Sequence, residues 1–123
     1  MKVYIAALYS TKDNAAAEAV RQLVEAGHES TAQWINGAEE TRTQAEAAVM
    51  DLEDVDRADA LILLALPIGT LYKGGGRHFE MGYAVARGKK VIVVGDYETV
   101  FCHLPKVLVC PTVGAAINFL EVI

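Results

Sequence analysis

An acidic side chain directly behind a glycine-rich loop is the first feature of the sequence that can carry chemistry. Residues 74–84 read Gly-Gly-Gly-Arg-His-Phe-Glu-Met-Gly-Tyr-Ala, and Glu80 follows the last glycine of the run by four positions. The apolar neighbours predict a helix largely surrounded by core, where a carboxylate needs a partner or a chemical task. The alternative is an ordinary acid near a helix N-terminus, which the helix dipole favours.

The glycine run itself has two interpretations. Gly74, Gly75 and Gly76 match no Walker or dinucleotide-binding fingerprint, so they can form a simple turn. Alternatively, their backbone lets a ligand approach closely and directs free N–H groups at a phosphate or hydroxyl group. Arg77 and His78 would add charge to such a loop.

Three further candidates also have a purely structural interpretation. Asp51 lies on a predicted helix, and the acids that follow it are typical of a solvated face: Glu53, Asp54 and Asp56. Tyr4 lies in a predicted strand, where the ring packs as core and the hydroxyl needs a partner if it is buried. Trp34, the only tryptophan, either packs in the core or stacks on a flat ligand.

Strands and helices alternate along the chain that carries these residues. Apolar runs predict strands over residues 3–8, 30–35, 60–66, 91–94 and 107–109, and helical spacing predicts helices over residues 15–26, 41–58, 76–87 and 112–120, with Thr41 capping the second helix. This alternation implies βαβ units with right-handed crossovers. We therefore expect one α/β domain over residues 1–123, a three-layer α/β/α sandwich with a five-stranded parallel sheet in the flavodoxin-like, Rossmann-like order 2-1-3-4-5.

The expected topology brings two of the candidate segments together. Ligands of such sheets bind beyond the carboxyl ends of the strands, near the point where the strand order reverses. Tyr9 and Ser10 follow the first strand, and the loop of residues 67–76 follows the third. These segments should lie side by side and form the crevice.

Composition and charge exclude several classes of protein. The chain is 53% apolar and carries a net charge of −5, which argues against disorder and against binding to a nucleic-acid polymer. No apolar run reaches the roughly 20 residues of a membrane span, and no signal peptide is visible, so we expect a cytoplasmic protein that contacts no membrane. Cys102 and Cys110 are expected to be buried thiols, and the scattered histidines and cysteines predict no metal site.

Residues 76–91 resemble the signature of the nucleoside 2-deoxyribosyltransferase family, whose superfamily includes 2′-deoxynucleoside 5′-monophosphate N-hydrolases and a cytidine monophosphate hydrolase. They read Gly-Arg-His-Phe-Glu-Met-Gly-Tyr-Ala-Val-Ala-Arg-Gly-Lys-Lys-Val. Residues 3–6, Val-Tyr-Ile-Ala, are similar to the opening strand of that family. Asp51-Leu52, followed by Asp59 before an apolar strand, is similar to its helix with a substrate-binding aspartate. The likeness covers nearly the whole chain.

The resemblance implies specific roles. Glu80 would be the carboxylate that attacks C1′ of a deoxyribosyl group, and Tyr4 would hydrogen-bond to Glu80 and orient it. Asp51 would bind the sugar or base and relay a proton to the leaving base. An incoming base or water would then open the ester. Displacement at carbon needs no cofactor. The resemblance also implies a homo-oligomer, as is common in this family. His103 is then the candidate for a residue that completes the site of a neighbouring subunit.

One position departs from the family pattern. Typical transferases carry an aspartate six residues before the nucleophile, where this chain has Gly74. Asp51 or His78 would have to stand in for that acid. The glycines, Arg77 and the turn that begins at Ser10 indicate an anion-friendly pocket, which favours a 5′-monophosphate substrate and hydrolysis over base transfer. A nucleotide-binding module without turnover is the alternative from another functional class.

Overall fold

Five parallel strands form one sheet in the order β2-β1-β3-β4-β5. A computed structural model describes residues 1–71 and 74–122 of the chain. The strands are β1 (Lys2–Ala6), β2 (Glu29–Ser30), β3 (Ala60–Leu64), β4 (Lys90–Val94) and β5 (Val107–Cys110). The predicted strand order is confirmed, and β1 and β3 are neighbours in register, with Tyr4 beside Leu61.

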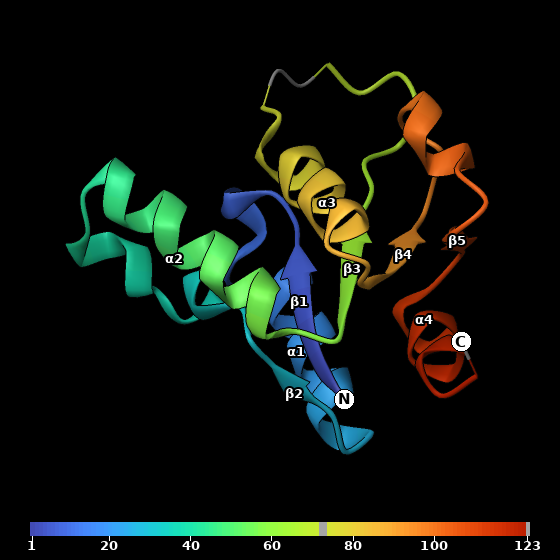
Figure 1. Ribbon diagram of the computed structural model, residues 1–123, viewed down its shortest axis with the longest axis horizontal. Coiled ribbons are helices and arrows are strands. Elements are labelled where there is room, and N and C mark those ends of the chain that lie inside the picture. Colours follow the sequence, from blue (N-terminus) through green and yellow to red (C-terminus); the bar gives the residue numbers. More distant parts are fainter. Residues whose placement is uncertain (72–73, 123) are drawn as a thin grey trace.

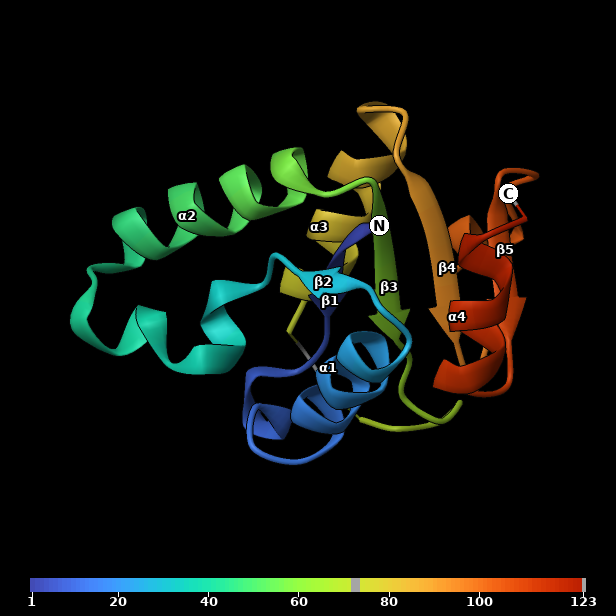
Figure 2. The same cartoon turned by 90° about the horizontal axis from the view of Figure 1, so that it is seen from below.

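Helices cover both faces of the sheet and complete the predicted three-layer sandwich. The helices are α1 (Ala15–Glu25), α2 (Gln44–Arg57), α3 (Gly76–Ala86) and α4 (Val113–Leu120). Helices α1 and α4 pack against each other on one face, and α2 packs against α3 on the other (Figure 2). Figure 1 shows α3 lying along β3, while α2 extends away from the sheet beyond β1.

Short polar side chains determine where three of these helices begin. Asn14 caps α1, and Thr112 caps α4 by accepting a hydrogen bond from the Ala115 amide. Thr43 and Glu46 form a reciprocal capping box at α2. Helix α3 differs, because it begins behind Gly75 without a side-chain cap. Its first-turn amides therefore donate to no capping side chain, at the edge of the sheet where a ligand is expected.

The central strands supply the core. The largest fully buried side chains include Tyr4, Ile5, Leu61, Ile62, Leu63 and Ile92. Cys102 and Cys110 are buried free thiols, as expected. None of the helices within residues 1–71 and 74–122 is long and apolar enough to cross a membrane.

Two predictions, for the second strand and for the start of the second helix, are wrong. Tertiary contacts explain the first, and the local capping box of Thr43 and Glu46 explains the second. The strand expected over residues 30–35 ends at Ser30, and residues Gln33–Asn36 form a 3-10 helix, η2, because Asp54 holds Gln33 and the Trp34 indole donates to the Ile5 carbonyl. Thr41 does not cap the second helix. It ends another 3-10 helix, η3 (Ala38–Thr41), and the cap falls two residues later.

Candidate active site

A cavity of about 180 Å³ lies beyond the carboxyl ends of β1 and β3. The described residues that line it are Ala7, Leu8 and Tyr9 after β1, Trp34 from η2, Glu39 from η3, Asp51 from α2, Gly74 before α3, and Gly76, Arg77 and Glu80 within α3. The cavity therefore occupies the point where the strand order reverses, which is the place that the topology predicts for a ligand.

Glu80 and Tyr4 are joined by a short hydrogen bond within this region. The Tyr4 hydroxyl donates to Glu80 Oε2 at 2.6 Å, across 76 positions of sequence. Tyr4 is fully buried in β1. Burial and the charge of Glu80 raise the pKa of Tyr4 far above its ordinary range, so the hydroxyl keeps its proton and acts only as a donor here. The bond fixes one carboxylate oxygen and leaves the other for a ligand.

The surroundings of Glu80 make it a weaker acid than usual. Burial raises its pKa to about 7, although the hydrogen bond from Tyr4 lowers it, and the negative charges of Glu39 and Asp54 add to the rise. Near neutral pH, Glu80 therefore exchanges between its neutral and ionised forms. A buried carboxylate of this kind is poorly solvated and is suited to act as a base or nucleophile.

Asp51 is the second acid of the cavity and has a third acid beside it. Burial raises the pKa of Asp51 to about 8, and a hydrogen bond with Glu39 and the charge of Glu80 contribute to the rise. Asp51 Oδ1 is buried, and no donor among the described residues reaches it. Burial and the neighbouring carboxyls thus favour the protonated form of Asp51, whereas the hydrogen bond from Tyr4 favours the ionised form of Glu80, so the two carboxyls can take opposite roles.

The acidic face expected on α2 is only partly correct. Asp54 is fully buried rather than solvated. It accepts hydrogen bonds from the backbone and side-chain nitrogens of Gln33 and pairs with Arg57 at 2.8 Å. Asp54 thereby ties the segment that carries Trp34 to α2, while Asp51, one turn earlier on the helix, is left to face the cavity.

Aromatic rings form another wall. The rings of Tyr9 and Trp34 are 6.1 Å apart between centroids. The indole N–H of Trp34 is already satisfied by the Ile5 carbonyl, at 3.1 Å, so the ring is fixed in orientation. Trp34 is both a core residue and part of the cavity wall, where a flat heterocycle can pack against it.

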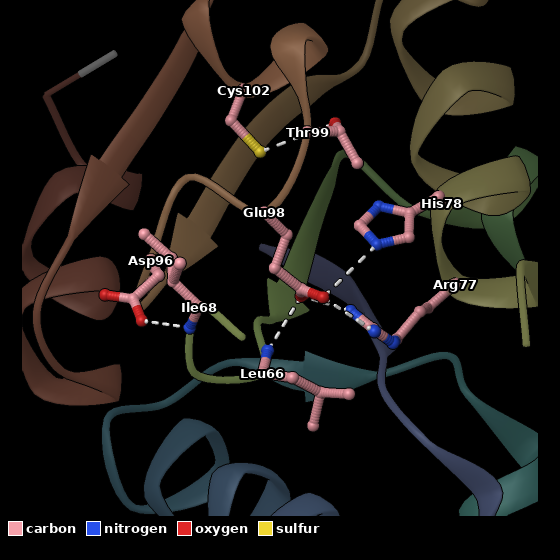
Figure 3. A network of polar contacts seen from close by, with 8 residues as sticks. All are labelled: Leu66, Ile68, Arg77, His78, Asp96, Glu98, Thr99 and Cys102. Carbon is pink, nitrogen blue, oxygen red and sulfur yellow. Dashed lines mark hydrogen bonds and ion pairs between the residues drawn. The ribbon is translucent and has the colours of Figure 1, made fainter. Parts of the chain in front are cut away.

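Arg77 lines the cavity but is not the unpaired cation that an anion-friendly loop would provide. It is buried, and its guanidinium forms a two-pronged ion pair with Glu98 (Figure 3). Glu98 also accepts from the Leu66 amide at 2.7 Å. Burial would raise the pKa of Glu98, but Arg77 and the Leu66 amide lower it below its ordinary value. This network joins the start of α3 to the end of β3, with Glu80 one helical turn further on.

Several predicted site residues lie apart from the cavity. His78 points to Glu98, 3.7 Å away, and lines a neighbouring apolar groove together with Phe79 and Phe101. His103 is exposed and stacks on Tyr97. Among the described lining residues of the cavity, Tyr4, Ser10, Gly75, His78 and His103 are absent, and the other predicted site residues are present. Tyr4 reaches the site only through its hydrogen bond to Glu80.

Helix α3 is also less enclosed than its apolar sequence predicts. Met81 and Ala84 are buried, but the side chain of Phe79 is 67% exposed. Phe79 lies on the side of α3 that faces the apolar groove. Within residues 1–71 and 74–122, no group of three or more His, Cys, Asp or Glu residues is arranged to hold a metal ion.

Two acids of the site were missed by the sequence interpretation. Glu39 lies in a short 3-10 turn and Glu98 in a loop, and neither segment matches a motif. The only local signal for Glu39 is its place directly after the Asn36-Gly37 turn, which predicts a surface loop near the second strand. Its approach to Asp51 and Glu80 depends on the two consecutive 3-10 helices η2 and η3, which no sequence motif predicts.

Comparisons with known proteins identify the family of the chain. A family model described as nucleoside 2-deoxyribosyltransferase matches residues 3–117, so the resemblance seen in residues 76–91 is confirmed. None of the curated proteins matches significantly.

Two solved structures share the fold. A CMP N-glycosidase from Clostridium botulinum has a TM-score of 0.66 at 18% identity, covering 99% of this chain and 98% of that one. A 2-deoxyribosyltransferase from the psychrotolerant bacterium Bacillus psychrosaccharolyticus has a TM-score of 0.71 at 17% identity, covering 96% and 91%. At these identities, the likeness to the two structures establishes the fold.

Proposed function

Since the chain belongs to the nucleoside 2-deoxyribosyltransferase family and is thus an N-glycosyl transferase or hydrolase, we propose that it cleaves the N-glycosidic bond of a 2′-deoxynucleoside or its 5′-monophosphate through an ester with Glu80. The observation that carries the proposal is the 2.6 Å hydrogen bond from Tyr4 to Glu80 at the edge of a cavity that also contains Asp51. It leaves one buried carboxylate oxygen positioned for attack.

The reaction proceeds by two displacements. The ionised oxygen of Glu80 attacks C1′, the C1′–N bond breaks, and its electron pair goes to the base nitrogen, which takes a proton from Asp51. The transition state resembles an oxocarbenium ion, so a fixed carboxylate beneath C1′ stabilises it. Tyr4 holds the other oxygen throughout. In the second step, a base or water attacks C1′, its proton returns to Asp51, and Glu80 leaves as a carboxylate.

The leaving base would pack against the aromatic wall. Trp34 and Tyr9 offer a fixed apolar surface beside Asp51. A protonated carboxyl next to that surface can reach a ring nitrogen of a stacked heterocycle. This combination suits a nucleobase better than an aliphatic leaving group.

Hydrolysis of a 5′-monophosphate is the second candidate. Gly74 lines the cavity where typical transferases have an aspartate, which favours water over a second base as the acceptor. The glycine-preceded start of α3 can donate backbone N–H groups to a phosphate. The Arg77–Glu98 ion pair opposes this candidate, because Glu98 neutralises the nearby cation.

Substrate incubations separate these candidates. The protein is incubated with each 2′-deoxynucleoside and each 5′-monophosphate, with and without a free acceptor base, and the bases are followed by chromatography. Base exchange identifies a transferase, and free base from a monophosphate without exchange identifies a hydrolase. Glu80→Gln should abolish product while circular dichroism stays native, whereas Glu53→Gln, an acid of α2 outside the cavity, should retain it. A nucleotide-binding module would release no base at all.

The covalent step has its own measurement. A 2′-fluoro-2′-deoxyarabinosyl nucleoside slows opening of the ester, because fluorine destabilises the oxocarbenium-like transition state. We expect a mass increase of one fluorosugar on the peptide that contains Glu80, and none in Glu80→Gln. Full turnover without such an adduct would exclude the ester route.

We also propose a homo-oligomer. Phe79 and Phe101 are 67% and 63% exposed and line the same apolar groove, and an exposed apolar surface of this kind is typical of an interface. Light scattering of the wild type and of Phe101→Glu measures the mass directly. A monomeric wild type would remove this proposal.

A further inference from the structure

Glu39 is the acid of the cavity that the two-carboxyl mechanism above leaves unused. It lines the cavity together with Asp51 and Glu80, and its charge acts on both of them. Glu39 comes from η3, a segment held in place by the left-handed Gly37 and by the hydrogen bond from the Arg42 amide to the Glu39 carbonyl. The position of the carboxyl is therefore built into the fold of this turn.

Glu39 and Asp51 are two carboxyls that line one cavity. Two carboxylates this close to each other repel when both are ionised, which favours a single proton shared between them. Asp51 Oδ1 has no donor among the described residues, and its hydrogen bond with Glu39 raises the pKa of Asp51. Without Glu39, Asp51 would be an isolated half-buried acid with fewer reasons to stay protonated at neutral pH.

Glu39 also lines a second space beside the cavity. A groove of about 400 Å³ adjoins the cavity and shares two lining residues with it, Tyr9 and Glu39. Asp51 lines the cavity but not the groove. Glu39 therefore lies between Asp51 and the groove, where it can pass a proton to Asp51.

Building on the proposed function, we infer that Glu39 and Asp51 form an acid pair that shares one proton, and that this proton is delivered to the leaving base. Glu39 thereby supplies the second carboxyl of the site, in place of an acid at position 74. When the C1′–N bond breaks, its electron pair and the shared proton go to the base nitrogen, and the pair becomes doubly ionised. When water opens the ester, one proton of that water returns to the pair and the hydroxyl group stays on C1′.

The test compares leaving groups. A 7-methylated purine leaves as a neutral base and needs no acid, whereas its unmethylated parent does. The proteins are Glu39→Gln and, as a matched control, Glu40→Gln. Glu40 is the adjacent acid, exposed and 3.6 Å from Lys12, and it is not among the described lining residues of the cavity. The substrates are 2′-deoxyguanosine and 7-methyl-2′-deoxyguanosine, or 2′-deoxyuridine and its 5-fluoro derivative if the enzyme accepts only pyrimidines.

We expect Glu39→Gln to lower kcat/KM about 10- to 100-fold on the parent substrate and less than about threefold on the activated one, since general-acid catalysis contributes about 10²–10⁴-fold in full. Its alkaline pH limb should also move to lower pH, because the hydrogen bond and the charge by which Glu39 raises the pKa of Asp51 are gone. Glu40→Gln should match the wild type in both measurements.

Two outcomes would overturn the inference. One is that Glu39→Gln and the wild type show the same ratio of kcat/KM between the two substrates and the same alkaline pH limb. The other is an equal loss on both substrates with an unmoved limb, which would show that Glu39 serves binding or folding instead. Failure of the proposed function itself looks different, since Glu80→Gln would then retain activity on the activated substrate.

Discussion

Replacing Tyr4 by phenylalanine tests how the fold tunes the nucleophile. The substitution keeps the buried ring and removes only the hydroxyl that donates to Glu80 at 2.6 Å. That hydrogen bond lowers the pKa of Glu80, and its removal leaves burial and the nearby charges to raise it further. We therefore predict that Tyr4→Phe makes Glu80 harder to ionise.

The magnitude follows from the charge on the acceptor. A hydrogen bond to an ionised group contributes about 1.5–3 kcal/mol, and one pKa unit corresponds to about 1.4 kcal/mol. The pKa of Glu80 should thus rise by about 1–2 units from its value of about 7. At pH 7, the ionised fraction then falls from about one half to between about one tenth and one hundredth.

The assay uses an activated substrate, 7-methyl-2′-deoxyguanosine or 5-fluoro-2′-deoxyuridine, which isolates the acid limb because its base needs little or no protonation. We expect kcat/KM to fall about 5- to 50-fold at pH 7 and less than about twofold at pH 9, as the limb moves to higher pH. Tyr83→Phe is the matched control, because Tyr83 also donates to a carboxylate, Asp56 at 2.8 Å, and does not line the cavity in the described residues.

Two results would refute this reasoning. An acid limb that stays in place while the rate falls equally at every pH would mean that Tyr4 does not tune the ionisation of Glu80. A Tyr4→Phe enzyme with the rate of the wild type would mean that the hydrogen bond has no part in catalysis. A loss shared with Tyr83→Phe would point to general destabilisation.

Three further predictions concern pH and stability. The wild type should show a bell-shaped kcat/KM profile on an unactivated substrate, rising with the ionisation of Glu80 near pH 7 and falling with that of Asp51 near pH 8; a flat profile between pH 6 and 9 would contradict it. The pKa of Glu80 is raised from 4.5 to about 7 in the folded state. Its contribution to the free energy of unfolding is therefore complete below pH 4.5 and is lost as the pH rises through 7. Urea unfolding should therefore find Glu80→Gln more stable than the wild type at pH 9, by on the order of 2 kcal/mol after allowing for partial exposure, with a smaller difference at pH 4.5. Glu98→Gln should destabilise by about 2–4 kcal/mol, since it removes the charge that faces buried Arg77. Asp96→Asn should cost less than about 1 kcal/mol, because it removes an exposed charge and keeps an oxygen that can accept from the Ile68 amide.

The sequence by itself determined the sheet order and the position of the central acid. Apolar runs that alternate with helical patterns predict a parallel sheet with right-handed crossovers. Few strand orders satisfy that rule, and the order 2-1-3-4-5 is among them. Glu80 stood out because its neighbours along the chain are also its neighbours in the helix. The family signature lies within the same 16 residues, so no long-range information was needed.

The tertiary structure alone decided which polar groups meet. Glu39 reaches Asp51 because a 3-10 turn replaces the expected strand, and that turn depends on Trp34 and Asp54 being buried together. Arg77 pairs with Glu98 across 21 positions of sequence, so its charge is cancelled where the loop sequence predicted a free cation. Hydrophobic periodicity reports which side of an element is buried, but it carries no information about the partner of a buried charge. The partner of each buried charge is determined by which distant segments of the chain pack against it in the folded structure.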